Sequence, residues 1–394
     1  MDMFQKCFDY DRPEKVKAMG LYPYFVPLQG HVGAEMEIGG HGLIMLGSNN
    51  YLGLTDNPYV MEKSREAILK YGTGCTGSRF LNGTLDIHLE LEDRLTKFLQ
   101  KEACLTFSTG FQANLGTIGT LGLRGDILYL DRKNHASIID GARMSYAKVV
   151  KYRHNDLEHL RHILEKHPGE SGMIITDGVF SMEGDLADIN GLADLAEEFG
   201  VRLLVDDAHG VGAMGTAGMG TAEHQGCHNR VDVVVGTFSK SFACIGGFAA
   251  GPASVISYLR HNARTNIFSA SLPPAAVATV IAALDVIERE PELLVKVHHA
   301  ADRCREGLAS MGFNIGQSEA PIIPVTVGDD LDCFRFWKDM FDNGVFTNPV
   351  VSPAVEPGQA MLRTSFMASH TDDMIDRALE VFKKVGRRHN LIGG

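Results

Sequence analysis

A single lysine, Lys240, stands between two serines in the stretch Gly236 to Gly247, GTFSKSFACIGG. The stretch follows the apolar run 231–235, and a strand that ends in small and hydroxylated residues can present an amine in a polar pocket. Partial desolvation there lowers the pKa of a lysine amine and makes it available for Schiff-base chemistry. An isolated Ser-Lys-Ser is better interpreted as part of a surface loop. Residues upstream must therefore decide whether Lys240 lies in a pocket or on the surface.

A second apolar run, 201–205, leads directly into Asp206-Asp207-Ala208-His209. A carboxylate at the carboxyl end of a buried parallel strand lies where ligands bind in open α/β sheets. Asp206, His209 and Lys240 together match the needs of pyridoxal 5'-phosphate. The carboxylate keeps the pyridine nitrogen protonated, and the lysine holds the aldehyde as an imine. The alternative is that Asp-Asp-Ala-His only caps a helix or forms a turn. This is less favoured, because Lys240 supplies the amine that the cofactor also needs.

The segment 108–112 closes one predicted strand and begins a helix, which predicts a phosphate cradle. Backbone N–H groups at a helix start bind anions, and Gly110 allows the anion to come close. Thr237, Ser239 and Ser269 would add hydroxyl donors to the same phosphate. Strand-to-helix turns are common, so this segment predicts a phosphate site only in combination with Lys240.

Three further polar residues each have two interpretations. His135 follows the predicted strand 127–130, and its imidazole either stacks over the cofactor ring or caps the next helix. Arg363, in a short apolar strand, either grips a substrate carboxylate bidentately or forms a salt bridge between domains. Asn50, in the tight loop 47–54, either contacts a substrate or only satisfies backbone groups.

The composition and net charge exclude some classes of protein. The chain has 394 residues, of which 44% are hydrophobic and 22% charged, and a net charge of -12, which argues against a nucleic-acid binder. Its seven cysteines are scattered and odd in number, so reduced thiols in a cytoplasm-like compartment are expected. No secretory signal or membrane span is visible. The histidines at 154, 159, 162 and 167 lack metal-ligand spacing, so no metal is expected.

Strand and helix patterns alternate from residue 86 onward, which predicts an α/β fold with a mostly parallel sheet covered on both faces. Expected strands are 103–107, 127–130, 148–152, 173–176, 201–205 and 231–235. Expected helices are 58–71, 86–100, from 111, 136–145, 156–166, 189–199 and around 274–287. A hairpin is expected at 34–46. Pro291 marks the passage to a smaller α+β domain with strands at 322–327 and 361–365 and helices at 331–342 and 372–385. The expected division is an arm and small hairpin over 1–57, a cofactor-binding large domain over 58–290 and a C-terminal domain over 291–394.

With these residues in view, the chain resembles the α-oxoamine synthases. These are fold-type I pyridoxal-phosphate enzymes that condense an amino acid with an acyl-CoA and release carbon dioxide. The likeness covers roughly residues 30 to 385, and the joint match is specific although each motif is weak. It runs through NNYLGL, GSRFLNGT, DRKNHASI, DGVFSMEGD, DDAHGVG, GTFSKSF, NIFSAS and LRTSFMASHT.

The resemblance implies a role for each matching position. Lys240 would hold the cofactor aldehyde, Asp206 would pair with the pyridine nitrogen, and Arg363 would bind the substrate carboxylate. A homodimer with shared active sites is implied as well. The remaining implied contacts are His209 and Ser181 with the ring oxygen, His135 with the ring face, Gly110, Phe111, Thr237 and Ser239 with the phosphate, and Ser269 and Ala270 with the neighbouring subunit's cofactor.

Within the family the serine-using branch fits best, because Ser-Lys-Ser-Phe is followed by Ile-Gly-Gly-Phe, whereas other branches more often have glycine before the lysine. This branch implies condensation of L-serine with palmitoyl-CoA, a long-chain acyl-CoA, to 3-ketodihydrosphingosine, in the first step of sphingolipid synthesis. The expected location is cytoplasmic, with peripheral contact to the inner membrane. Rivals are the branches that join glycine to acetyl-CoA, alanine to pimeloyl-CoA or glycine to succinyl-CoA, a non-catalytic partner subunit and an ordinary aminotransferase.

Overall fold

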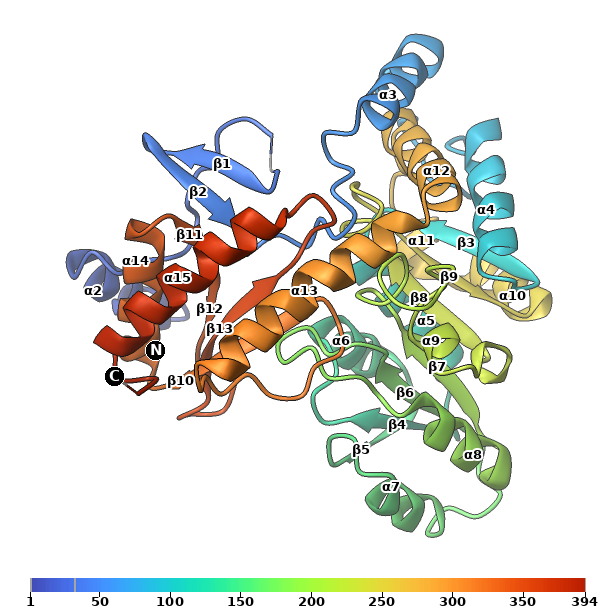
Figure 1. The fold of residues 1–394 in the computed structure, drawn as a ribbon. Coiled ribbons are helices and arrows are strands. Elements are labelled where there is room, and N and C mark those ends of the chain that lie inside the picture. The colour runs from blue at the N-terminus through green and yellow to red at the C-terminus, as the bar shows by residue number, and fades with distance from the viewer. Residues whose placement is uncertain (1, 32, 394) are drawn as a thin grey trace.

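A seven-stranded sheet dominates the computed structural model, which describes residues 2–31 and 33–393 (Figure 1). Its strand order is β3-β9-β8-β7-β6-β4-β5, and of these strands β9 alone runs antiparallel to its neighbours. The prediction of a mostly parallel sheet is therefore confirmed. The strands are β3 (Ala103–Phe107), β4 (Ile127–Asp131), β5 (Lys148–Tyr152), β6 (Gly172–Asp177), β7 (Arg202–Asp206), β8 (Val233–Thr237) and β9 (Gly247–Gly251).

Both faces of this sheet are covered, because successive strand residues point to opposite sides. On β7, for example, Leu203 and Val205 join one buried cluster while Leu204 joins the other. The Leu204 side packs against α5 (Gly110–Leu121), α6 (Ala136–Met144) and α10 (Ala253–Asn262). The opposite side packs against α4 (Asp86–Phe98), α7 (Leu157–Leu164), α8 (Ile189–Phe199) and α12 (Pro274–Arg289).

Helix ends follow the local sequence. The helix α3 (Pro58–Tyr71) has the bounds that the sequence predicts, since Asn57 accepts hydrogen bonds from the N–H groups of Tyr59 and Val60 and Pro58 occupies the first turn. Short helices α9 (Thr221–His224), η1 (His228–Arg230) and α11 (Arg264–Ile267) complete this part. The strand β9 was not predicted, because a run of glycine, alanine and one phenylalanine has little strand propensity.

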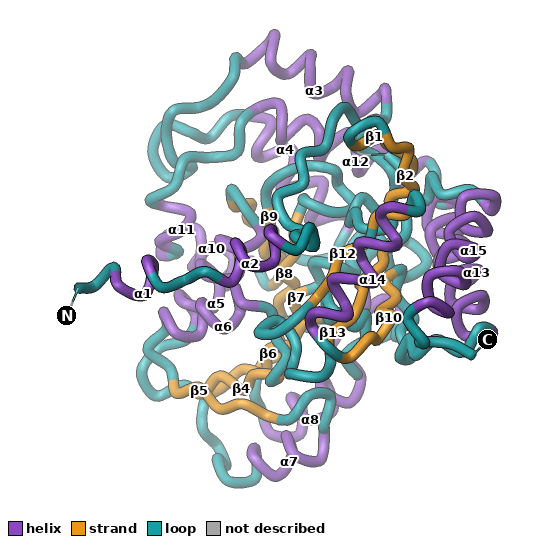
Figure 2. The backbone as a smooth tube through the Cα atoms, turned by 90° about the vertical axis from the view of Figure 1, so that its left-hand side faces the viewer, coloured by secondary structure: helices purple, strands orange, loops and turns teal. Residues whose placement is uncertain are grey.

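A smaller antiparallel sheet forms the C-terminal part, in the order β10-β13-β12, with helices against it (Figures 1 and 2). Its strands are β10 (Ile322–Gly328), β12 (Asn348–Val350) and β13 (Ala360–Ser365), and its helices are α13 (Glu292–Ser310), α14 (Asp330–Asp342) and α15 (Asp372–Arg388). The predicted hairpin is present as β1 (Glu35–Ile38) and β2 (His41–Met45), and the distant β11 (Val345–Phe346) pairs in parallel with β2. The domain boundaries at 57/58 and 290/291 stay a prediction.

The N-terminal arm lies on the outside of the molecule. Its helices, α1 (Gln5–Phe8) and α2 (Arg12–Ala18), contain no buried residue, and Figure 2 shows α1 extending away from the rest. Across residues 2–31 and 33–393, no helix is both long and apolar enough to cross a bilayer.

Candidate active site

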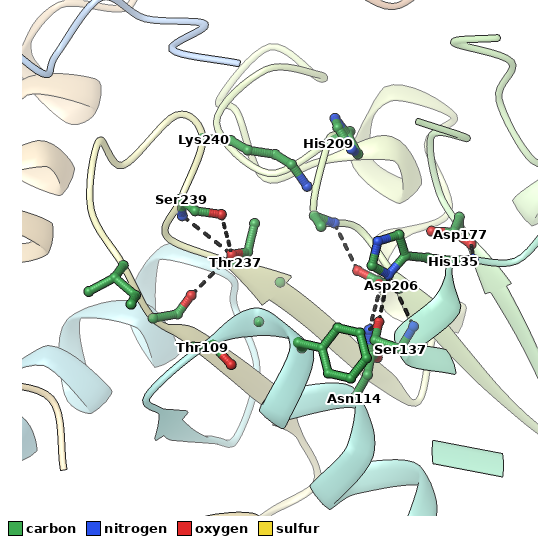
Figure 3. A pocket seen from close by; sticks show the side chains of 16 residues that line it. Thr109, Asn114, His135, Ser137, Asp177, Asp206, His209, Thr237, Ser239 and Lys240 are labelled. Atoms are coloured by element: carbon green, nitrogen blue, oxygen red, sulfur yellow. Dashed lines mark hydrogen bonds between the residues drawn. The ribbon is translucent and has the colours of Figure 1, made fainter. Parts of the chain in front are cut away.

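The carboxyl ends of β6, β7 and β8 open into one cavity of about 320 Å³ (Figure 3). Asp177 and Asp206 are partners in the register of β6 and β7, and Thr237 ends β8. The lining includes eight of the predicted site residues. It also includes Asn114, Ser137 and Asp177, which were not predicted. The full lining is Thr109, Gly110, Phe111, Asn114, His135, Ser137, Asp177, Asp206, Ala208, His209, Gly236, Thr237, Ser239, Lys240, Ile245 and Gly246.

Lys240 lies in the loop after β8 and reaches over the cavity (Figure 3). Burial lowers the pKa of its amine to about 8, although the nearby Asp206 carboxylate acts in the opposite direction. Within the described residues its Nζ has no hydrogen-bond or ion-pair partner. A lysine with a pKa this close to neutral releases its proton readily, which is what imine formation requires.

Asp206 is buried at the end of β7 and is held by two donors. The side-chain amide of Asn114 donates to Asp206 Oδ2 at 2.6 Å, and the backbone N–H of Ala208 donates to Oδ1 at 3.1 Å. Asn114 Nδ2 also donates to Ser137 Oγ at 2.9 Å. Asn114 therefore orients the carboxylate, a role that its position in the first turns of a helix did not reveal.

His209 is buried and its Nδ1 lies 2.7 Å from the hydroxyl of Tyr51, which is itself fully buried. Burial holds the pKa of His209 well below its usual value, and the charge of Lys240 lowers it further. The imidazole is therefore neutral at physiological pH. Tyr51 comes from a segment far away in the sequence, and it fixes one ring nitrogen of His209.

His135 caps a helix, which was one of its two interpretations, and its stacking on a cofactor ring stays a prediction. It is the N-cap of α6, where Nδ1 accepts from the backbone N–H of Ser137 at 3.2 Å, and it also lines the cavity. Its own backbone N–H donates to Asp177 Oδ2 at 2.8 Å. Burial lowers the pKa of His135, so the ring is neutral and its proton is on Nε2.

The start of α5 forms the floor of a cradle beside the loop after β8. Thr109 caps this helix by accepting from Gln112 N–H at 3.0 Å. A Cβ added at Gly110 would lie 2.7 Å from the Thr237 side chain, so only glycine lets the start of α5 come this close to the end of β8. Thr237 Oγ1 lies 2.9 Å from the hydroxyl of Ser239. The donors, the carboxylate and the amine together fit pyridoxal phosphate.

Arg363 is buried on β13 outside the cavity lining, only 5% exposed. Its Nε donates to the backbone carbonyl of Ser181, and its Nη2 donates to Asn49 Oδ1 at 3.0 Å. Neither contact is the inter-domain ion pair that was the alternative interpretation. Asn49 was not among the predicted residues, and no spacing signal in the loop separates it from Asn50.

Besides Arg363, four of the predicted site residues do not line the cavity of a single chain. Asn50 holds its own loop, since its Oδ1 accepts from Leu54 N–H at 3.0 Å and its Nδ2 donates to Thr55. This matches the structural alternative, and a contact between Asn50 and substrate stays a prediction. The other three are Ser181, Ser269 and Ala270, whose cofactor contacts also stay predictions.

Comparison with known proteins shows the same architecture. The family described as aminotransferase class I and II matches residues 41–382. A serine palmitoyltransferase of Sphingobacterium spiritivorum is 49% identical over 94% of both chains. An 8-amino-7-oxononanoate synthase of Thermoanaerobacter pseudethanolicus is 41% identical over 98% of both. The solved structure of the Sphingomonas wittichii serine palmitoyltransferase covers 100% of both chains with a TM-score of 0.96 and 35% identity.

The family match spans residues 41–382, a range that contains both the lysine loop and β13. It also confirms the predicted fold class, a fold-type I arrangement built on a mostly parallel sheet. The chain belongs to the aminotransferase class I and II family and, within it, to the α-oxoamine synthases.

Proposed function

We propose that this chain is a pyridoxal-phosphate-dependent serine palmitoyltransferase, which condenses L-serine with palmitoyl-CoA to 3-ketodihydrosphingosine and releases CoA and carbon dioxide. The observation that carries the proposal is the meeting of Lys240, Asp206 and His209 in one cavity of a chain from this family. A second candidate, 8-amino-7-oxononanoate synthase, is favoured only by the more distant relatives of that name.

Pyridoxal phosphate supplies an electron sink that stabilises negative charge on the Cα of the bound amino acid. The protein would hold it through its own side chains. Lys240 would bind the aldehyde, Asp206 would accept from the pyridine nitrogen and Asn114 would keep Asp206 in place. The remaining proposed contacts are His209 and Ser181 at the ring oxygen, His135 at the ring face, and Gly110, Phe111, Thr237 and Ser239 at the phosphate.

Lys240 is also the proposed base. With a pKa of about 8, its amine gives up and takes back a proton near neutral pH at little cost. It would remove the Cα proton of bound serine onto Nζ. The neutral rings of His135 and His209 add no further positive charge beside this amine.

Arg363 is the proposed site of the serine carboxylate. A guanidinium binds a carboxylate through two parallel hydrogen bonds, and its grip decides which bond at Cα points away from the cofactor plane. Ser181 and Asn49 hold two of its nitrogens, so the group is pre-oriented before serine arrives.

A homodimer with shared active sites belongs to the same proposal. Two large apolar side chains are exposed in the single chain: Ile245, which lines the cavity and is 56% exposed, and Phe268, which precedes Ser269 and is 75% exposed. A second copy would cover them and bring Ser269 and Ala270 to the neighbouring cofactor. A cytoplasmic location agrees with the seven free cysteines. Peripheral contact with the inner membrane would give access to a lipidic acyl-CoA.

The test is an assay with purified, cofactor-loaded protein. L-Serine with palmitoyl-CoA should yield a product with the mass of 3-ketodihydrosphingosine. Glycine with acetyl-CoA, glycine with succinyl-CoA and alanine with pimeloyl-CoA should yield far less, and turnover that is fastest with one of those pairs would overturn the substrate assignment. Lys240→Ala should abolish condensation while the exposed Lys97→Ala should not.

A further inference from the structure

One histidine outside the cavity lining lies between two carboxylates. His154 Nδ1 is 3.0 Å from Asp131 Oδ1 at the end of β4, and Nε2 is 3.6 Å from Asp185 Oδ2. The ring also packs edge-on against Phe180, with centroids 4.4 Å apart and an interplanar angle of 88°. His154 therefore connects the carboxyl end of β4 to the loop that follows β6.

His154 is a cation at neutral pH. Burial lowers its pKa, but the hydrogen bond and charge of Asp131, together with the Asp185 carboxylate 3.6 Å from Nε2, outweigh that effect and raise the pKa to about 9. Lys133 is the cation nearby that opposes them, and its own amine is 2.6 Å from Glu183 Oε1. An uncharged side chain at position 154 would leave Asp131, which is fully buried, without this ion pair.

The loop so held, residues 180–186, also carries the contact to Arg363. The backbone carbonyl of Ser181 accepts from Arg363 Nε. Three other hydrogen bonds fasten the rest of the loop to both parts of the molecule: Lys133 to Glu183, Asn155 Nδ2 to the carbonyl of Leu186, and Ser318 Oγ to the carbonyl of Gly184. The guanidinium also donates to Asn49 Oδ1 at 3.0 Å and to Ser365 Oγ at 3.5 Å, so a shift of this loop would move one of the three groups that orient it.

We propose that His154 is a positioning residue for the amino-acid carboxylate: held between Asp131 and Asp185, it fixes the 180–186 loop and, through the Ser181 carbonyl, the orientation of Arg363. The inference rests on the proposed function, because it requires Arg363 to bind the serine carboxylate. Bidentate binding depends on orientation, so a small displacement of the guanidinium weakens it. The effect should fall on serine affinity and leave the acyl-CoA step unchanged.

The test compares His154→Gln, Asp185→Asn and the double variant in the cofactor-loaded full chain. Serine dissociation constants come from the change in cofactor absorbance on titration, and hydrogen exchange of residues 178–187 reports the loop directly. Each single variant should weaken serine binding by roughly 2- to 30-fold and speed exchange in the loop, and the double variant should be no weaker than the worse single one. KM for palmitoyl-CoA should stay at the wild-type value.

Two control variants distinguish a failure of this inference from a failure of the proposed role of Arg363. His162→Asn changes an exposed histidine on α7 and should leave serine affinity unchanged. Arg363→Lys tests the proposed function: if it leaves serine affinity unchanged, the role of Arg363 fails and this inference fails with it. If Arg363→Lys weakens serine binding but neither His154→Gln nor Asp185→Asn does so, only the inference is overturned. Should His154→Gln not fold, Asp185→Asn decides alone, since its side chain is 34% exposed and tolerates substitution better.

Discussion

Replacing Lys240 by methionine should stabilise the cofactor-free protein while it destroys the proposed activity. The buried amine has a pKa of about 8 where a solvated lysine has 10.5, so the folded state carries a charged group at a cost below pH 8. At about 1.36 kcal/mol for each pH unit, this difference corresponds to roughly 3 kcal/mol. Methionine has a similar length and no charge, so Lys240→Met should raise the free energy of unfolding by about that amount at pH 7.

The sign of this effect sets its pH dependence. The folded-state pKa is the lower one, so between pH 8 and 10.5 the unfolded chain binds more protons and wild-type stability rises with pH. The advantage of Lys240→Met should therefore shrink as pH rises, to about 1 kcal/mol at pH 10. Below pH 8 it should stay constant, because the lysine is charged in both states.

Urea unfolding of cofactor-free wild type and variant at pH 7 and pH 10 measures this directly. Lys97→Met serves as the matched control, since its side chain is 71% exposed and its substitution should change stability by less than about 0.5 kcal/mol. A variant that is no more stable than wild type at pH 7, or whose advantage does not depend on pH, would refute the argument that burial lowers the pKa of Lys240.

Three further substitutions test contacts that only the fold reveals. Asn114→Ala removes the 2.6 Å donor to Asp206, which should cost roughly 2 kcal/mol in unfolding free energy and weaken cofactor binding, measured by urea titration and by cofactor dialysis. Tyr51→Phe leaves Nδ1 of buried His209 unpaired and should cost about 1–3 kcal/mol, with unchanged stability counting against the contact. Gly110→Ala places a Cβ 2.7 Å from the neighbouring threonine side chain and should reduce cofactor affinity by about 10- to 100-fold in an absorbance titration.

The sequence by itself determined the sheet and the main groups on its edge. Strands buried on both faces read as unbroken apolar runs, so β4, β7 and β8 were found within two residues of their true ends. The carboxyl ends of parallel strands meet at one edge, which was enough to bring Asp206, His209 and Lys240 together. Caps such as Asn57 act within a few residues, so the start of α3 was also predictable.

Only the tertiary structure decided which distant groups touch. The contacts of Asn114 with Asp206 and of Tyr51 with His209 join residues far apart in the chain, and each depends on how one element is rotated and placed against another. Spacing along a sequence contains no such information. The same reason explains why Asn49 rather than its neighbour Asn50 reaches Arg363: adjacent residues in a tight loop point in different directions, and only the packed fold selects one.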